Sequence, residues 1–581
     1  MTWRRNLVSW IQNRCARRWA HSQSVSPAKA YDVVIIGAGH NGLVSAAYMA
    51  KCGMTVGVLE RRHIVGGAAV TEEIIPGYKF SRASYLLSLL RPVVIDQLEL
   101  KKHGLRYHIK NPTSFTPVLG TKKSLLLGND QDANQRSIGQ FSQRDAEAFS
   151  RYEHWLSHLS TAVDKLLDLE PPAITSNGQD WRTRLVQLRQ LGRVFQAVAP
   201  IGLRGFSDLI DLMASPADKI LRKWFESEPL LATLATDGVI GSMSGPKTPG
   251  TGYVLLHHVM GELDKRPGVW AFVVGGMGAV SEAIAKAARS YGAHIFTSCS
   301  VKTIRVDGNR ASCVILDNGT EVVAKKCILS NATPQVTFLD LIPGGILPQD
   351  FLKAIKSIDY TSPVTKINVA VDRLPNFSCL PNISDLPMPH HQTTIHLNSE
   401  SMDAVQDAFV EAGQGDWSRR PLIEMTIPTS VDETMAPRGC HVVHLFTQYT
   451  PYRLRNGRQW DDGTKKEYAE LVFESIDAYC PGFRRSIVGY EALPPPELER
   501  VFGLTGGNIF HGSMSLDQLY HARPVLGFGS YRTPIDGFYL CGSGAHPGGG
   551  VMGAPGRLAA LAALKDCKVN MKQLKKFDGK M

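Results

Sequence analysis

A glycine turn near one end of the chain has the spacing that brings protein backbone against a phosphate group. Gly37, Gly39 and Gly42 follow a β-branched run and precede a stretch with helical periodicity. Gly37 permits a tight turn out of a strand, Gly39 leaves room for a pyrophosphate, and Gly42 lets a helix pack closely on a sheet. The unpaired N–H groups at the start of that helix favour an anion. The pattern therefore predicts a dinucleotide site.

An acidic residue lies at the distance expected for a ribose contact. Glu60 lies 18 residues beyond Gly42, at the end of a second predicted strand, where a carboxylate can bind the hydroxyls of an adenosine ribose. Arg61 and Arg62 could indicate a 2′-phosphate, but Glu60 would repel that group. A second glycine turn at 65–68 suits a longer dinucleotide, so we favour FAD over NAD(P). The alternative, a glycine turn without a ligand, leaves Glu60 unexplained.

A further glycine-rich segment lies close to the other end of the chain. A short apolar strand leads into the loop 542–553, and an Ala- and Leu-rich helix is expected over 554–565. This arrangement repeats that of the first site, because backbone can approach a ligand at the start of a helix. A flexible glycine loop is the alternative, although regular elements flank the loop closely on both sides.

Regular elements are expected to hold these loops in place. Residues 32–59 read as a strand, a helix and a strand, which form a βαβ unit of a parallel sheet. A helix that ends near Gly292 follows the glycines at 275–278. Residues 145–230 read as mostly helical, with Leu-rich faces that build core, and further strands are expected at 360–372 and 438–449.

Three segments of the chain resemble, in order, the FAD-binding segments of the FAD-containing amine oxidases and phytoene desaturases, which include the carotenoid and retinoid oxidoreductases. They read DVVIIGAGHNG with VLERRHIVGGAAV, then GGMGAVSEAIAKAA, then YLCGSGAHPGGGVMGAPG. The resemblance implies an α/β fold, with a discontinuous Rossmann-like FAD-binding domain of the glutathione reductase type and an interleaved α+β substrate domain. The FAD domain would comprise 31–85, 265–335 and 490–567, the substrate domain 86–264 and 336–489, and a tail 568–581.

The resemblance also implies which residues hold FAD. Backbone at Val301 would contact the adenine, and the loop that contains His546 would lie near the pyrophosphate and the flavin ring. His40 and Asn41 would touch the phosphate or groups on the flavin side. The complete set of candidate cofactor-binding residues is Gly37, Gly39, His40, Asn41, Gly42, Glu60, Arg61, Gly66, Gly67, Ala68, Val301, Gly542, His546, Gly549, Gly550 and Val551.

No group of side chains identifies the catalytic residues. A flavin carries the electron chemistry, and hydride transfer to it needs no side-chain acid or base. His546 could hydrogen-bond the flavin or the substrate, or it could only cap its loop. His511, between turn-forming glycines, is a second catalytic candidate. Tyr85 could line a cavity, although simple burial also accounts for it.

Basic residues are concentrated at the N-terminus. The formal net charge is +11, yet six basic residues and no acidic residue precede Asp32. The remaining excess is spread thinly, so nucleic acid is not an expected partner. Residues 1–30 have the composition of a mitochondrial targeting peptide, which predicts the matrix or the matrix face of the inner membrane. An uncleaved helix on a membrane surface is the alternative, and peripheral membrane contact stays open.

The ten cysteines show no C-x-x-C pair and no metal-ligand spacing, and no second GxGxxG is present. Neither a metal site nor NAD(P)H-driven disulfide reduction is therefore expected. Hydrophobic residues make up 43% of the chain, which fits a globular protein. No stretch reaches the about 18 uninterrupted apolar residues of a membrane-spanning helix.

Together these features predict a mitochondrial FAD-dependent oxidoreductase. It would transfer hydride from a hydrophobic or amine-like small molecule to the flavin, as a desaturase or an oxidase, and an unidentified electron acceptor would reoxidise the flavin. The alternative is an FAD-binding protein with a regulatory or scaffold role in mitochondria and little turnover. The glycine motifs and Glu60 predict FAD binding in both cases. The sequence does not identify the substrate or the oligomeric state.

Overall fold

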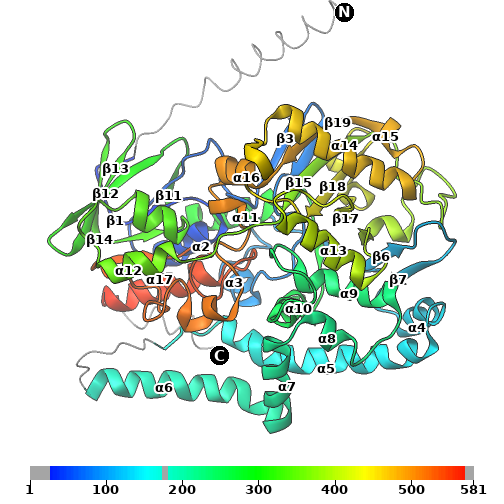
Figure 1. Ribbon diagram of the computed structural model, residues 1–581. Helices are drawn as coiled ribbons and strands as arrows, with labels where there is room; N and C mark the ends of the chain where they lie inside the picture. Colours follow the sequence, from blue (N-terminus) through cyan, green and yellow to red (C-terminus); the bar gives the residue numbers. More distant parts are fainter. Residues whose placement is uncertain (1–26, 173–180, 570–581) are drawn as a thin grey trace, which may run out of the picture.

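The computed structural model describes residues 27–172 and 181–569, which form two large sheets and a group of helices (Figure 1). Most of the predicted targeting segment 1–30 and most of the predicted tail 568–581 lie outside the described residues. No helix within the described ranges is both long and apolar enough to cross a membrane.

The first sheet is assembled from distant parts of the sequence. Its central strand Ala30–Ile36 is buried at Val33–Ile36, which fits a parallel strand covered on both faces. This strand runs parallel to its two neighbours, and the predicted strand, helix and strand over 32–59 are confirmed. The spatial order is β11 (His294–Phe296), β2 (Val56–Leu59), β1 (Ala30–Ile36), β14 (Glu321–Ser330), β13 (Arg310–Leu316) and β12 (Val301–Asp307), with β20 (Phe538–Leu540) paired to β14.

Three helices cover this sheet, namely α2 (His40–Lys51), α11 (Gly278–Ser290) and α17 (Ala554–Asp566). Both α11 and α17 pack directly on α2. Their close approach requires small residues: a Cβ added at Gly556 would lie 2.1 Å from the carbonyl oxygen of Asn41. The helices predicted near 278 and over 554–565 are confirmed.

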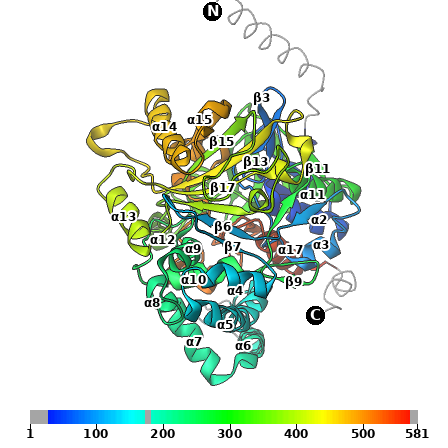
Figure 2. The ribbon, with the colours of Figure 1, turned by 90° about the vertical axis from the view of Figure 1, so that its right-hand side faces the viewer.

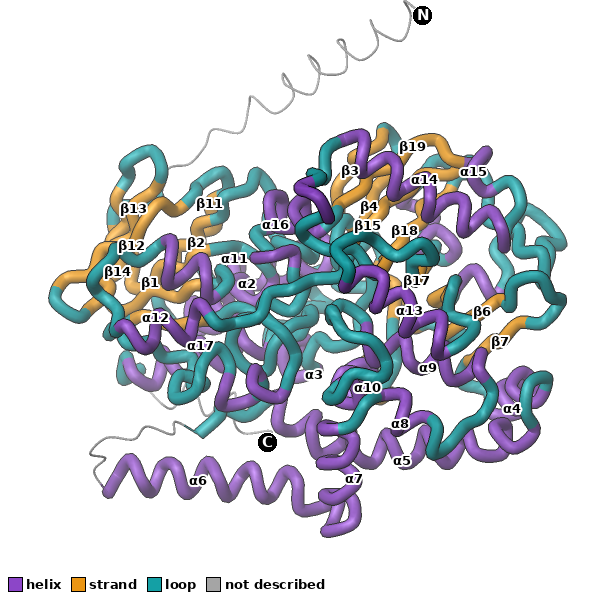
Figure 3. Tube along the Cα trace, viewed as in Figure 1, coloured by secondary structure: helices purple, strands orange, loops and turns teal. Residues whose placement is uncertain are grey.

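The second sheet is mostly antiparallel and lies beside the first (Figure 3). Its order is β19 (Ile487–Leu493), β15 (Thr365–Val371), β18 (His441–Gln448), β17 (Leu422–Thr426), β16 (Thr394–Leu397), β6 (Ser114–Pro117) and β7 (Ser124–Leu127). The strands predicted over 360–372 and 438–449 are confirmed as β15 and β18. The predicted boundary at 490 falls inside β19, whose pairing with β15 places the whole strand in the second sheet.

A helical layer lies below the second sheet in Figure 1 and is seen from another side in Figure 2. It contains α4 (Gln131–Gly139), α5 (Gln143–Leu167), α6 (Trp181–Val198), α7 (Gly202–Ala214), α8 (Ala217–Leu221), α9 (Glu228–Val239) and α10 (Thr251–Val259). Apolar side chains of α5, α7 and α8 share one buried core, as predicted for 145–230, and side chains of α9 and α10 join it. The prediction is wrong for α6, where Leu188 and Leu191 are exposed.

The other α-helices and strands connect or cover these layers. They are β3 (Thr71–Ile75), β4 (Tyr78–Ser81), α3 (Pro92–Gln97), β5 (Tyr107–Ile109), β8 (Glu262–Leu263), β9 (Arg266–Pro267), β10 (Ala271–Val273), α12 (Gln349–Lys356), α13 (Met402–Gly413), α14 (Asp462–Tyr479), α15 (Phe483–Ser486) and α16 (Pro495–Phe502). Of these, α14 packs against the second sheet through Tyr468, Val472 and Phe473.

The carboxyl ends of three parallel strands bring the ligand loops together. Strands β1, β14 and β20 end at Ile36, Ser330 and Leu540. The Asn331 N–H donates to the Ile36 carbonyl at 2.8 Å, and the Cys541 N–H donates to the Ser330 carbonyl at 2.8 Å. Ligands of open α/β sheets bind at this kind of edge, so the fold itself indicates where the site lies.

Candidate functional site

The first glycine turn closes tightly around Asn331. A Cβ at Gly42 would lie 2.2 Å from the Gly37 carbonyl oxygen, and a Cβ at Gly39 would lie 2.7 Å from Nδ2 of Asn331. Gly37 has a φ of +90°, which L side chains rarely adopt. The helix that follows begins at His40, and no side chain caps its first N–H groups. Such a terminus is suited to a phosphate.

Glu60 lies buried next to this turn. Its Oε2 accepts a 2.8 Å hydrogen bond from the Ala38 N–H, and its Oε1 accepts one of 2.9 Å from the Arg62 N–H. A carboxylate has about four lone-pair positions, so both oxygens can still accept bonds from ribose hydroxyls. The Cys299 N–H donates to the Glu60 carbonyl at 2.8 Å, which brings the segment leading to Val301 alongside.

The two arginines after Glu60 face other partners. Arg61 Nη2 donates to the carbonyls of Arg500 and Val501 at 3.2 and 3.1 Å. Arg62 Nη2 forms an ion pair with Glu72 at 2.6 Å. Both guanidinium groups thus have protein partners, although Nη1 of Arg62 is buried without one among the described residues. These partners favour a ribose hydroxyl over a 2′-phosphate beside Glu60.

The second and third glycine segments meet the first. The Gly66 N–H donates to the Ala38 carbonyl at 2.8 Å, and a Cβ at Gly67 would lie 3.3 Å from the Gly39 Cα. In the C-terminal loop, a Cβ at Gly542 would lie 2.8 Å from the Asn331 carbonyl oxygen. All three segments thus form one cradle, in which side chains in place of the glycines would occupy the space. A bound dinucleotide fits these residues.

Asn41 also lies in this cradle, whereas Gly549 packs against Phe510. Asn41 Nδ2 donates to Ser543 Oγ at 3.2 Å, while its buried Oδ1 has no partner among the described residues. A Cβ at Gly549 would lie 2.4 Å from the Phe510 Cα. The Asn41 oxygen is thus one buried acceptor in the cradle that a ligand could satisfy.

A cavity of about 530 Å³ opens where the cradle meets the second sheet and the helical layer. The predicted residues that line it are His40, Ala68, Tyr85, His511, Gly550 and Val551. The opposite walls carry apolar side chains from α5 and α10, with Trp270 and Phe446. A flavin ring held by the cradle would therefore face a largely apolar space.

Two of the predicted residues that line the cavity, His40 and His511, are histidines that burial keeps neutral. Burial lowers the pKa of His40 to about 4 and that of His511 to about 3, where Arg523 and His40 add to the effect. His40 Nε2 and His511 Nδ1 are buried without a partner among the described residues. Each ring can thus exchange one hydrogen bond with a ligand in the cavity.

His546 occupies a different place from the one its loop position suggested. Its Nε2 lies 3.0 Å from the carbonyl oxygen of Leu166 in α5, and its ring meets the ring of Tyr520 edge-on at 5.0 Å. It is not among the residues that line the cavity. The His546 side chain therefore fastens its loop to the last turn of α5 and does not reach the cavity.

A polar cluster lies in the cavity wall. The Tyr85 hydroxyl donates to Glu424 Oε2 at 2.9 Å, and Lys110 Nζ donates to Thr394 Oγ1. Asp237 also lines the cavity, and its carboxylate makes no hydrogen bond with a described residue. Burial and the nearby Asp237 raise the pKa of Glu424 to about 8, and burial lowers the pKa of Lys110 to about 7. The cluster can hold or exchange a proton near neutral pH.

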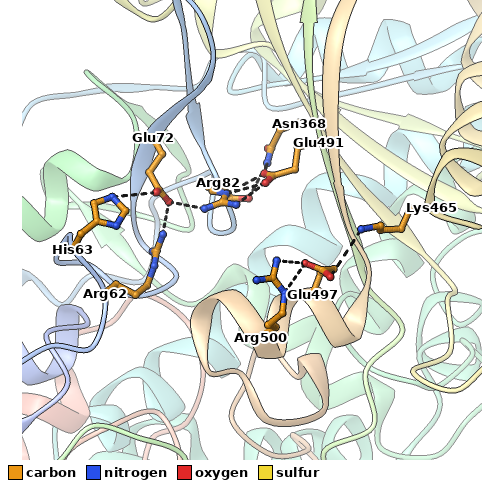
Figure 4. Close-up of polar contacts among 9 residues, drawn as sticks. All are labelled: Arg62, His63, Glu72, Arg82, Asn368, Lys465, Glu491, Glu497 and Arg500. Atoms are coloured by element: carbon orange, nitrogen blue, oxygen red, sulfur yellow. Dashed lines mark hydrogen bonds and ion pairs between the residues drawn. The ribbon is translucent and has the colours of Figure 1, made fainter. Parts of the chain in front are cut away.

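An ion-pair network fixes the segment that carries Tyr85 (Figure 4). Arg82 pairs with Glu72 at 3.1 Å and with Glu491 at 2.6 Å, and Glu72 also pairs with Arg62. Because Glu491 belongs to β19, the network joins the strand after the cradle to the second sheet. It thereby fastens the chain just before Tyr85 to the sheet that supplies Lys366 and Phe446 to the cavity.

Sequence reasoning missed Asn331, Lys110, Asp237 and Glu424. Asn331 could have been found as a polar residue at the end of a buried strand, beside the predicted dinucleotide strand. Asp237 and Glu424 each interrupt an apolar run, LLATLATDGV and PLIEMT. An isolated acid in such a run is costly to bury without a function or a partner.

Comparisons with known proteins agree with this geometry. Residues 35–95 match an NAD(P)-binding Rossmann-like domain, and residues 241–413 match the flavin containing amine oxidoreductases. The solved structure of wild-type putrescine oxidase bound to putrescine has a TM-score of 0.57 and 15% identity, and the match covers 93% of this chain and 100% of that one. The shared fold confirms the predicted fold class.

Relatives match nearly the whole chain, and two of them are informative. A limonene dehydrogenase component of Castellaniella defragrans is 25% identical over 564 residues, which cover 94% of this chain and 97% of the relative. Pyridine nucleotide-disulfide oxidoreductase domain-containing protein 2 of Rattus norvegicus is 55% identical over 547 residues, which cover 93% and 94%. The chain therefore belongs to the family of the latter protein, within the FAD-dependent oxidoreductases of the flavin containing amine oxidoreductase type.

Proposed function

We propose that the cradle holds FAD along its full length. The uncapped start of α2 would bind the pyrophosphate, Glu60 would bind the adenosine ribose, and backbone near Val301 would contact the adenine. The side of the cradle formed by His40, Ala68 and the glycine loop 548–551 would hold the flavin ring against the cavity. Bound flavin supplies the two-electron acceptor for a hydride.

The substrate that this site fits is an apolar small molecule with one polar or amine-like group. The observation that carries this proposal is a single cavity shared by the flavin side of the cradle and by apolar walls such as Leu156, Leu255 and Trp270. The apolar walls would orient a C–H bond toward the ring and exclude water. The name of the limonene dehydrogenase relative supports an apolar substrate, and that of putrescine oxidase supports an amine.

The polar cluster is proposed to bind the polar group of the substrate. Asp237 offers a carboxyl group that makes no hydrogen bond with a described residue, and Glu424 is held by Tyr85 at the same wall. With a pKa lowered to about 7, Lys110 can accept a proton from an ammonium substrate, whose neutral form is the one that loses hydride. No described cysteine lines the cavity, so disulfide chemistry is not part of this proposal.

The location proposed is the mitochondrial matrix or the matrix face of the inner membrane. It rests on the arginine-rich, acid-free composition of residues 1–30. Fractionation of cells that express the full chain, compared with a chain that lacks residues 1–30, tests this point. Retention of both forms in mitochondria, or exclusion of both, would contradict it.

The chemical proposal is tested on the purified chain. The nucleotide released on denaturation should be FAD, and anaerobic addition of a suitable substrate should bleach the bound flavin. A panel that pairs each apolar alkylamine with the neutral alkene of the same length separates the two substrate types. FAD that is bound but stays oxidised with every compound would favour the scaffold role.

A further inference from the structure

Helices α6 and α7 project from the helical layer (Figures 1 and 2). Both carry large apolar side chains that are exposed. Leu191 and Phe195 of α6 are 51% and 73% exposed, and Leu203 of α7 is 91% exposed. Leu188, Phe206 and Ile210 are also exposed. Clusters of this kind on soluble proteins mark interaction sites.

The exposed side chains follow helical spacing. Leu188, Leu191 and Phe195 recur at positions i, i+3 and i+7 of α6, and Leu203, Phe206 and Ile210 do so on α7. Each set therefore forms a stripe along one face of its helix. The α7 stripe is separate from its buried face, since Leu209 and Leu212 pack into the protein core.

The polar residues around these stripes are basic. Arg189, Arg193 and Arg204 are exposed and form no ion pair with a described residue. The sequence of α6 contains no acidic residue. The two acids of α7 are occupied: Asp208 accepts a hydrogen bond from Trp155 Nε1 at 3.2 Å, and Asp211 pairs with Lys219 at 3.3 Å and with Lys223.

This helical pair lies directly behind one wall of the cavity. Phe149, Tyr152 and Leu156 of α5 line the cavity. On α5, Trp155 contacts Asp208 of α7, and His158 lies close to Gly205 of α7. A surface bound at α6 and α7 would thus be one helix layer away from the substrate space.

We propose that α6 and α7 form a docking surface for an anionic lipid bilayer. Apolar stripes flanked by unpaired arginines match the composition of helices that lie in the membrane interface. The arginine heads would meet lipid phosphates while their stems accompany the apolar residues into the headgroup layer. A protein partner would more often meet charges of both signs, whereas the exposed charges described beside the two stripes are those of Arg189, Arg193 and Arg204, and Asp208 is bonded to Trp155 of α5. As a consequence, which rests on the proposed function, apolar substrate would reach the cavity from the membrane.

The test uses the full chain with bound FAD and sedimentation with vesicles of phosphatidylcholine, with and without cardiolipin. We expect binding to the anionic vesicles that weakens with salt. Leu191→Asp combined with Phe195→Asp should reduce the bound fraction at least about tenfold. Arg189→Gln and Arg193→Gln should each reduce it roughly fivefold on anionic vesicles only.

A matched control comes from another face. Ile383→Asp with Leu386→Asp replaces side chains that are 88% and 72% exposed, and it should leave vesicle binding unchanged. All variants keep the same N-terminus, so a contribution of residues 1–30 cancels. Equal losses in both double variants, or no binding by the wild type, would overturn the proposal. A wild-type dimer that becomes monomeric in Leu191→Asp/Phe195→Asp, without vesicle binding, would identify a protein interface instead.

The substrate reaction is read separately. Membrane binding does not require turnover, so the vesicle result holds or fails regardless of the proposed chemistry. Flavin bleaching by a water-soluble substrate should be equal in the wild type and in the Leu191→Asp/Phe195→Asp variant.

Discussion

The Tyr85 hydroxyl donates a 2.9 Å hydrogen bond to Glu424 across the cavity wall. The bond joins the segment that follows the FAD cradle to strand β17 of the second sheet. Burial and Asp237 raise the pKa of Glu424 to about 8, although Tyr85 and Lys110 oppose the shift. Glu424 is therefore mostly protonated at neutral pH and can donate as well as accept a hydrogen bond.

Replacing Glu424 by Gln should flatten the dependence of stability on pH. In the folded state the carboxyl keeps its proton up to about pH 8, whereas in the unfolded state it loses it near its ordinary pKa. The folded state thus binds more protons, and the free energy of unfolding falls as the pH rises between these limits. Urea unfolding from about pH 5 to about pH 7 should show a shallower fall in Glu424→Gln. Equal slopes would contradict the protonated state assigned to Glu424.

Replacing Glu60 by Ala should weaken FAD binding by roughly 1.5–3 kcal/mol, the scale for hydrogen bonds to a charged group. The dissociation constant can be measured from the quenching of flavin fluorescence as FAD rebinds the apoprotein. Glu282→Ala on the exposed face of α11 is a control that should bind FAD as the wild type does. Equal affinity in Glu60→Ala and Glu282→Ala would refute the ribose contact.

Substitutions at the two candidate histidines should affect different properties, flavin reduction for His511 and stability for His546. His511→Ala removes a neutral ring from the cavity and should lower the rate of flavin reduction about tenfold, the scale of one hydrogen bond, with little change in FAD affinity. His546→Ala loses the contact with the Leu166 carbonyl and should lower the free energy of unfolding by about 1–3 kcal/mol. Single-turnover reduction and chemical unfolding measure the two effects. Slower flavin reduction in His546→Ala, with an unchanged rate in His511→Ala, would show that His546 is the residue that acts on the ligand.

Replacing Arg523 by Leu should destabilise the loops around the cavity. This guanidinium is completely buried and forms no ion pair with a described carboxylate. It donates to the carbonyls of Phe510, Gly512, Ser513, Gln518 and Ser543. Leaving several buried carbonyls unpaired should lower the free energy of unfolding by at least about 3 kcal/mol. The stability of Arg523→Lys should lie between those of the wild type and Arg523→Leu, because a lysine reaches fewer acceptors. A thermal midpoint of Arg523→Leu equal to that of the wild type would contradict this role.

The dinucleotide half of the fold could be predicted because its signals are local. Strand, glycine turn, helix and acid follow one another within residues 32–60, and each has a physical reason visible in the sequence. The helix that starts at Ala554 can be predicted for the same reason, since a glycine loop precedes it.

The cavity could not be predicted in the same way, because it depends on contacts between distant segments. Tyr85 and Glu424 are 339 positions apart, and nothing local to either residue indicates the other. For α6, the Leu-rich periodicity indicated a helix correctly, but periodicity does not reveal whether the apolar face packs on protein or stays exposed. On α6 the apolar face stays exposed at Leu188 and Leu191.

The central claim is that bound FAD oxidises a molecule held in the apolar cavity. The most direct measurement is anaerobic bleaching of the flavin by apolar amines and alkenes, compared between the wild type and Leu156→Trp, which fills the cavity. We predict that at least one compound bleaches the wild type and that Leu156→Trp, with the same FAD content, stays oxidised. Equal bleaching of both proteins would place the substrate elsewhere, and an oxidised wild type with every compound would contradict the oxidation of an apolar molecule in this cavity.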